Sequence, residues 1–365
     1  RVGLEYLAED RRDYWTSVID AAESQQSWEF ANNGWVVAAF QAAWSALFYT
    51  PVPADRPELG VFPSMQFRAA VERAVRAGAD TDTVGAIAGA LIGARWGQSA
   101  IPSEWLAAVH GYHKATAETL VRLAIAITCE TYATDWPHVD RMSTHGQSER
   151  LYTSRRVDGL YMGEQRALQV GTPPFDTVIS LSRIGVKESP VAHPFQLTVR
   201  IMDSQEPDKN PNLDFQYWDV SQQLHAWLSD GRKVFLHCVH TQNRTPSFYA
   251  AYLMYFQGLT FDEAQAEIGE TLPLARPNGY LRQRLQAIRP RRLASGGQIH
   301  DDLVLLCDSN DRPNAVYAEA GPVVLKRAGG VWVAAESRPE NLPLASAITV
   351  AQFDEREMAG ELSQR

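Results

Sequence analysis

The spacing of apolar positions changes twice along the chain, and the changes divide it into three zones. Over residues 1–130 the apolar positions follow a helical period. Residues 34–48 are apolar nearly all round, as in a buried helix, and residues 64–77 and 84–97 indicate two further helices. We therefore expect an all-α N-terminal region over residues 1–130.

The middle zone has a different pattern. Residues 131–155 are polar and interrupted by Pro137 and Gly146, which predicts a linker. Within residues 156–292, short apolar runs typical of buried strands alternate with amphipathic helices. The expected strands lie at 175–181, 195–203 and 233–238, and the expected helices at 219–231, 245–258, 261–270 and 279–288. This alternation predicts an α/β domain with a central, mostly parallel sheet.

The third zone, residues 296–365, contains short strand-like runs separated by Asn, Gly, Pro and Asp. These runs lie at 303–308, 315–320, 322–327 and 331–336. We expect a small β-rich C-terminal module here, and therefore a multidomain chain.

Composition excludes several classes of protein. The 365 residues are 45% hydrophobic and 21% charged, which is typical of a globular protein. A net charge of −9 argues against a nucleic-acid partner. The three cysteines show no paired spacing, as expected in a reducing compartment. No apolar run reaches the ~20 residues that span a membrane, and no signal peptide is visible. We expect a cytoplasmic protein without a membrane partner.

The segment from His237 to Thr245 separates a predicted strand from a predicted helix. Cys238 and Arg244 lie six positions apart, so the residues between them can curl around a phosphate with their N–H groups directed inward. These loop residues are Val239, His240, Thr241, Gln242 and Asn243. The positive end of the following helix favours both a bound anion and the nucleophilic thiolate of Cys238.

The flanking side chains suit the same chemistry. Arg244 can grip two phosphate oxygens with its planar fork. Thr245 can donate a hydrogen bond to the sulfur when it leaves, and His237 is expected to pack behind the loop. The alternative is structural: Cys238 is a small buried apolar residue, and Arg244 and Thr245 only begin a helix.

Phosphoryl transfer to sulfur also needs an acid that protonates the leaving oxygen. Asp203 is our candidate, because it ends a predicted strand 35 residues before Cys238 and opens a polar loop that could close over a substrate. The alternative is that Asp203 is a turn residue at a strand end. Asp208 and Asp214 are further candidates.

Residues 156–292 resemble the dual-specificity phosphatases of the cysteine-dependent class. Besides the loop, the runs at 159–168, 175–185 and 276–285 resemble the family's opening strand, second strand and closing helix. The resemblance implies that Cys238 is the nucleophile, Arg244 the phosphate clamp, Thr245 the assisting hydroxyl and Asp203 the acid. It also implies a phosphorylated protein or small phosphomonoester as substrate, and no cofactor for this step.

Two loop residues depart from the family pattern. Thr241 stands where the family usually has glycine, which tolerates a positive φ that a β-branched residue disfavours. We therefore expect either another backbone path or weaker activity. His240 is unusual too, and either contacts substrate or is simply exposed.

A second cluster, Gly78-Ala-Asp-Thr-Asp-Thr83, lies between two predicted helices. Its alternate carboxylates and hydroxyl are hard oxygen ligands that suit Mg²⁺. Asp and Thr are equally typical of helix caps, so capping is the alternative. The glycines at 85, 89, 93 and 97 predict a smooth face for close helix packing.

Residues 1–125 resemble the C-terminal part of ADP-ribosylglycohydrolases, with the closest likeness at 78–97. The resemblance implies Mg²⁺ ligands at Asp80, Asp82 and Thr83, and an ADP-ribosylated substrate. The family's upstream Thr-Asp-Asp cluster has no counterpart here, and the chain begins with Arg1, so we expect a partial hydrolase region or a fragment. Three hypotheses result: a cysteine-dependent phosphatase attached to this region, a Mg²⁺-dependent ADP-ribosyl hydrolase whose N-terminal half is missing, or a phosphate-binding module with little turnover.

Overall fold

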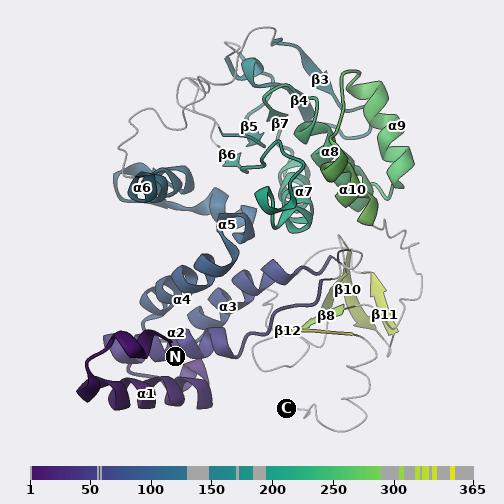
Figure 1. Ribbon diagram of the computed structural model, residues 1–365. Coiled ribbons are helices and arrows are strands. Elements are labelled where there is room, and N and C mark those ends of the chain that lie inside the picture. The colour runs from purple at the N-terminus through teal and green to yellow at the C-terminus, as the bar shows by residue number, and fades with distance from the viewer. Residues whose placement is uncertain are drawn as a thin grey trace. The chain divides into compact units, whose positions relative to one another are not determined.

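The computed structural model describes residues 2–55, 57, 60–129, 148–169, 172–183 and 195–288, together with strands between 304 and 349 (Figure 1). Contacts between residues divide the chain into two compact units. One unit comprises Arg1–Ala100 and Leu293–Arg365, and we call it the helical unit after its N-terminal part. The other, the α/β unit, comprises Ile101–Arg292.

The N-terminal part of the helical unit is built from α1 (Glu9–Ser24), α2 (Val36–Phe48), α3 (Gln66–Val75) and α4 (Thr81–Trp96). Helix α2 contacts the other three. Its core positions are small, with Ala39, Ala42, Ala43 and Ala46 all fully buried, so the backbones of its neighbours can approach closely. The predicted helical character of the N-terminal region is confirmed.

The glycines of α4 face α3. A Cβ added at Gly85 would lie 3.2 Å from Val75, and one at Gly93 would lie 3.7 Å from Phe67. The smooth face predicted from the four-residue spacing is therefore a packing surface. Gly97 is not part of it, because it caps the end of α4 with φ 75°.

The C-terminal strands form two antiparallel sheets. One has the order β11-β10-β9, and the other pairs β12 with β8. Their bounds are β8 (Val304–Cys307), β9 (Tyr317–Ala320), β10 (Val323–Ala328), β11 (Val331–Ala334) and β12 (Ser346–Thr349). Strand β12 was not among the predicted runs.

The α/β unit contains a five-stranded sheet with the order β3-β4-β7-β5-β6. Strand β3 is antiparallel to β4, and the other three pairings are parallel. The strand bounds are β3 (Leu151–Thr153), β4 (Leu160–Glu164), β5 (Thr177–Ser180), β6 (Phe195–Thr198) and β7 (Val234–Cys238). The predicted mostly parallel sheet is confirmed.

Strand β3 corrects the predicted linker at its C-terminal end. Leu151 pairs with Gly163 and Thr153 with Tyr161, so residues assigned to the linker form an edge strand. The run is too short and too polar to stand out as a strand, and only pairing with β4 gives it that structure. Residues 130–147 of the predicted linker lie outside the described residues.

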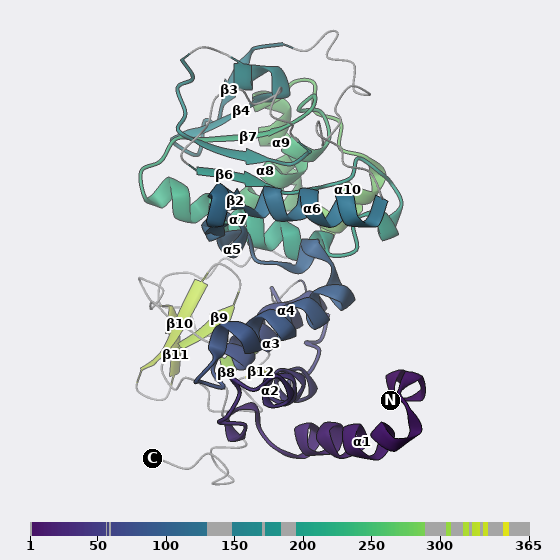
Figure 2. The same cartoon turned by 90° about the vertical axis from the view of Figure 1, so that its left-hand side faces the viewer.

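Four helices follow the sheet strands: α7 (Leu213–Ser229), α8 (Arg244–Phe256), α9 (Phe261–Thr271) and α10 (Gly279–Ala287). Helix α8 contacts β7, and α7, α9 and α10 all contact α8 (Figures 1 and 2). Helix α8 is buried along almost its whole length, from Arg244 to Tyr255, because neighbours surround it. This packing fixes the N-terminus of α8 at the end of β7.

The boundary of the α/β unit lies earlier than the sequence predicts. Helices α5 (Ser103–Ala108) and α6 (Ala117–Cys129) belong to this unit, separated by the short pair β1 (His110–Gly111) and β2 (Ala115–Thr116). The Ser103 N–H donates to the Asp219 carboxylate of α7 over 2.8 Å, and Arg200 pairs with Glu118 of α6. These tertiary contacts place the division after Ala100, whereas local composition places it within 131–155.

Within the described residues, no helix has both the length and the apolar character needed to cross a membrane.

Candidate active site

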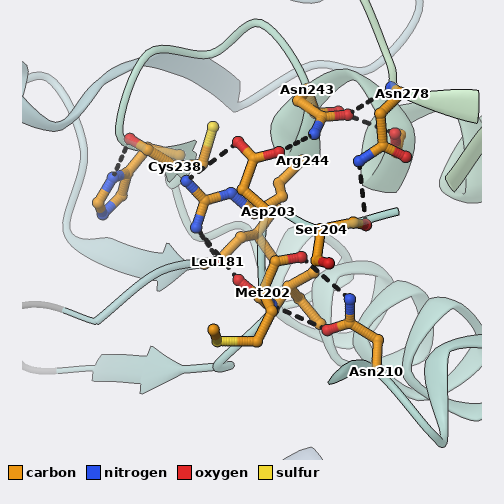
Figure 3. Close-up of polar contacts among 12 residues, drawn as sticks. Leu181, Met202, Asp203, Ser204, Asn210, Cys238, Asn243, Arg244 and Asn278 are labelled. Carbon is orange, nitrogen blue, oxygen red and sulfur yellow. Dashed lines mark hydrogen bonds and ion pairs between the residues drawn. The ribbon is translucent and has the colours of Figure 1, made fainter. Parts of the chain in front are cut away.

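The loop from Cys238 to Arg244 joins the carboxyl end of β7 to the first residue of α8. Strand β7 lies between β4 and β5, so the loop emerges at the middle of the sheet. Cys238 is 2% exposed, and Arg244 is 4% exposed. The local order strand, loop and helix is the one expected from the sequence, and it places the Cys238 thiol at a helix N-terminus (Figure 3).

Thr241 keeps the backbone conformation that glycine would favour. Its φ is 54°, in the left-handed region, although Thr is β-branched. Its side chain is 4% exposed, and its Oγ1 atom has no hydrogen-bond partner among the described residues. We expected either another backbone path or weaker activity at this position. The positive φ shows that the first expectation, another backbone path at Thr241, is wrong.

The Arg244 guanidinium is held on one side by backbone carbonyls. Its Nη1 donates to the Ile201 oxygen over 3.1 Å and to the Leu181 oxygen over 3.5 Å. Its Nη2 lies 3.7 Å from Oδ2 of Asp203. Its Nε atom is buried and has no partner in the described part of the chain. The Nε–Nη2 edge is thus the edge that can grip an anion.

Asp203 is the candidate acid that the tertiary structure brings to Arg244. Its side chain is 48% exposed, so it borders both the buried guanidinium and solvent. The other two candidates for the acid contact different residues. Asp214 accepts a 2.9 Å hydrogen bond from Nε of Arg284, and Asp208 lies 3.7 Å from the Lys209 amine.

Asn243 connects three segments at this site. Its side-chain nitrogen donates to Oδ1 of Asp203, and its side-chain oxygen accepts from the Asn278 N–H over 2.7 Å. The Asn278 side chain in turn donates to the Ser204 carbonyl over 3.2 Å and caps α10 by accepting from the Leu281 N–H. Figure 3 shows these bonds linking the loop, the acid segment and the start of α10.

His237 lies behind the loop and is fully buried. Its Nδ1 contacts the Cys238 carbonyl over 3.1 Å, and its Nε2 contacts the Ser180 hydroxyl over 2.7 Å. A carbonyl can only accept, so Nδ1 carries the proton, and in the neutral ring Nε2 accepts from Ser180. His237 therefore ties the loop backbone to β5.

The remaining loop residues divide between backbone anchors and exposed side chains. The Val239 carbonyl accepts from the Gln165 N–H over 3.2 Å, and the Gln242 carbonyl accepts from the Arg276 N–H over 2.5 Å. The side chains of His240 and Gln242 are exposed. Thr245 is fully buried, and its Oγ1 has no partner among the residues that the structure describes.

Three buried polar atoms of this one loop region therefore lack a partner within the described chain: Oγ1 of Thr241, Nε of Arg244 and Oγ1 of Thr245. A buried polar group without a hydrogen bond costs about 1–3 kcal/mol. Their concentration around Cys238 indicates a site built for a ligand with several acceptor oxygens.

Sequence reasoning missed the residues that assemble the site from outside the loop. The carbonyls of Leu181 and Ile201 orient Arg244, and Asn210 exchanges two hydrogen bonds with the Met202 backbone next to Asp203. Backbone acceptors leave no trace in a sequence. Asn278 does leave one, because an Asn after a Pro and before an amphipathic run is a typical helix cap.

The second cluster, Gly78–Thr83, forms the turn before α4 and the start of that helix, with Asp80 as the N-cap. Asp80 caps the helix by accepting from the Thr83 N–H over 3.4 Å, and Asp82 accepts from the same N–H over 3.0 Å. The pKa of Asp80 is lowered from its ordinary value, chiefly by a hydrogen bond with Asp82 and then by the Thr83 hydroxyl. Asp80 is partly exposed, and Asp82 and Thr83 are exposed. Capping, the alternative considered for this segment, is what the geometry shows.

Among the described residues, no group of three or more His, Cys, Asp or Glu side chains could hold a metal ion. Asp80, Asp82 and Thr83 supply two carboxylates and a hydroxyl, too few oxygens to fill the six-coordinate shell of Mg²⁺ without water or further ligands. Magnesium at these residues stays a prediction.

Comparisons with known proteins give separate matches for the N-terminal and middle parts of the chain. A family model described as ADP-ribosylglycohydrolase matches residues 2–133. The comparison with curated proteins gives no match.

Solved structures match the middle of the chain. Human DUSP28 is 22% identical, with 37% of this chain and 90% of that chain covered and a TM-score of 0.31. A mouse putative dual specificity phosphatase complexed with zinc tungstate is 20% identical, with 39% and 87% covered and a TM-score of 0.30. The human tyrosine phosphatase-like serine/threonine/tyrosine-interacting protein is 18% identical, with 38% and 95% covered and a TM-score of 0.32. Residues 2–133 thus match the ADP-ribosylglycohydrolase family model, and the middle region is similar to solved phosphatase structures.

Proposed function

We propose that the α/β unit is a cysteine-dependent phosphatase that hydrolyses phosphomonoesters through a cysteinyl-phosphate. One observation carries the proposal: in the segment that follows Cys238, Nε of Arg244 and the Thr245 hydroxyl are buried without partners in the described chain, while Asp203 lies against the Arg244 guanidinium. A phosphate supplies the acceptor oxygens that these donors lack.

The first step transfers the phosphoryl group to sulfur. The Cys238 thiolate attacks phosphorus, an S–P bond forms, and the bond from phosphorus to the ester oxygen breaks. The departing oxygen takes the electron pair of that bond and a proton from the Asp203 carboxyl group. Arg244 and the loop N–H groups bind the non-bridging oxygens, which stabilises the charge of the transition state. The phosphate thereby replaces Asp203 as the partner of Nη2.

The second step releases phosphate. Water attacks phosphorus and gives a proton to the Asp203 carboxylate, which restores the acid. The S–P bond breaks and its electron pair returns to Cys238 as thiolate, which accepts a hydrogen bond from the Thr245 hydroxyl. Both steps use only side chains of this chain and water, so we expect turnover to be independent of added metal.

The substrate class is a phosphorylated protein or a small phosphomonoester. The match of residues 2–133 to ADP-ribosylglycohydrolases supports ADP-ribosylated molecules as a second class of ligand for the helical unit. A cytoplasmic location remains the expectation from cysteine usage.

The test is turnover of p-nitrophenyl phosphate by the full chain with and without EDTA, for the wild type and for Cys238→Ser. We expect EDTA-resistant turnover that falls by at least about 10³-fold in the variant, as for other removed nucleophiles. Inorganic phosphate should inhibit the wild type and should bind both proteins, because Arg244 and the loop remain in the variant.

Absence of turnover in a wild-type protein that binds phosphate would reject catalysis and leave the phosphate-binding module as the function. Turnover that needs Mg²⁺ and survives Cys238→Ser would reject the cysteine mechanism and favour a metal-dependent hydrolase.

A further inference from the structure

Asn243 is the loop residue whose side chain reaches outside the loop in two directions. Its nitrogen donates to Oδ1 of Asp203, and its oxygen accepts from the Asn278 N–H over 2.7 Å. The orientation of the amide is fixed by chemistry, because the N–H of Asn278 can only donate and a carboxylate oxygen accepts. Asn243 is 9% exposed, and its carbonyl accepts from the Ser247 hydroxyl over 2.8 Å.

We propose that Asn243 is a positioning residue that holds the Asp203 carboxyl group in the orientation that protonates the leaving group. This inference rests on the proposed phosphatase activity and names a residue that the activity alone does not assign.

The backbone around Asp203 is fixed by other residues. The N–H and carbonyl of Met202 both bond to the Asn210 side chain, and the Ser204 carbonyl accepts from Asn278 (Figure 3). These contacts place the Asp203 backbone but leave its side-chain torsions free. With 48% of the side chain exposed, solvent offers the carboxyl group competing orientations.

Substrate binding removes one of the two side-chain contacts of Asp203. The contact with Nη2 of Arg244 spans 3.7 Å, and a bound phosphate takes over that nitrogen. Within the described chain, Asn243 is then the remaining polar partner of the Asp203 carboxyl group. Because the amide donates to Oδ1, that oxygen stays an acceptor, and the transferable proton resides on Oδ2, which faces the phosphate-binding guanidinium.

The experiment measures kcat/KM of the full chain for aryl phosphates whose leaving groups differ in basicity, from p-nitrophenyl phosphate to phenyl phosphate. A poorer leaving group depends more on the acid. We expect Asn243→Ala to lower kcat/KM by less than about threefold for p-nitrophenyl phosphate and by roughly tenfold or more for phenyl phosphate. In an Asp203→Ala background, Asn243→Ala should have no further leaving-group-dependent effect.

The inhibition constant of inorganic phosphate should stay within about threefold of wild type in Asn243→Ala, since Arg244 keeps its carbonyl contacts.

An equal fall for all leaving groups, or the same effect with and without Asp203, would show a structural role and overturn the inference while the phosphatase activity stands. Absence of turnover by the wild type would overturn the proposed function and the inference together.

Discussion

The loop between β7 and α8 and the turn before α4 share a local plan. Each leads into the N-terminus of a helix, and each contains a non-glycine residue in the left-handed region, Thr241 with φ 54° and Ala79 with φ 55°. Each also combines polar side chains of the kinds that bind phosphate or metal ions in proteins. Their surroundings differ: the first is buried in the α/β unit, and the second is largely exposed in the helical unit.

The difference lies in where hydrogen bonds are left unmade. In the turn before α4, the carboxylates of Asp80 and Asp82 share the Thr83 N–H, and the buried Asn33 binds the Gly78 carbonyl and the Asp80 N–H. These polar groups of the turn are therefore paired, by its own side chains and by Asn33. The β7–α8 loop instead leaves buried donors of Arg244, Thr241 and Thr245 without partners in the described chain. Burial with unpaired donors, more than residue type, distinguishes a ligand site from a helix cap.

The largest effect is expected from a substitution of Arg244, which has an unpaired buried donor in the β7–α8 loop region. Arg244→Lys removes the forked Nε–Nη2 edge but keeps a positive charge, so we expect kcat/KM for p-nitrophenyl phosphate to fall roughly 10²- to 10³-fold. The affinity for inorganic phosphate should fall with it. Arg276→Lys is the matched control, since Arg276 contacts the loop through its backbone N–H and its side chain is exposed. Unchanged kcat/KM in Arg244→Lys would mean that the charge, not the fork, matters, and equal losses in both variants would show an effect not specific to the fork of Arg244.

An intermediate effect, on stability, is expected from a substitution of Asn33, whose side chain holds the turn before α4. Asn33 is fully buried and makes hydrogen bonds of 2.9 Å to both the Gly78 carbonyl and the Asp80 N–H. Asn33→Ala should lower the free energy of unfolding of the helical unit by about 1–3 kcal/mol, because both groups lose a partner. Urea unfolding followed by tryptophan fluorescence measures the change.

Asn32→Ala serves as the control for that measurement, because Asn32 is exposed. Neither variant should change the turnover of p-nitrophenyl phosphate. A loss of turnover in Asn33→Ala without a loss of stability would contradict a purely structural role for the turn.

The smallest effect is expected at Thr241. The residue already has the left-handed φ that the loop requires, so Thr241→Gly relieves strain of about 1–2 kcal/mol and adds flexibility to the unfolded chain. These terms oppose each other, and we expect kcat/KM and the unfolding midpoint to change little, kcat/KM by less than about tenfold. A rise of more than a hundredfold in kcat/KM would show that Thr241 suppresses activity, as in the binding-module hypothesis.

Local patterns predicted the elements that carry the loop, and the reason is visible in the structure. Strand β7 is buried at every position, so it reads as an unbroken apolar run, and α8 begins at the first residue after the loop. Helix α7 shows the limit of such patterns. It begins at Leu213, six residues earlier than predicted, because Leu213, Phe215 and Tyr217 are buried by tertiary contacts after a Pro-Asn pair that indicates a loop.

By itself the sequence determined that Cys238, Arg244 and Thr245 lie on one strand–loop–helix segment, since residues so close in the chain must share a short loop. Only the tertiary structure decided that Asp203, and not Asp208 or Asp214, meets Arg244, and that Asn243 joins Asp203 to Asn278. Asp203 precedes Asn243 by 40 residues, and Asn278 follows it by 35. The order of strands in the sheet and the packing of α10 on α8 bring these residues together, and neither is encoded in the periodicity of any one segment.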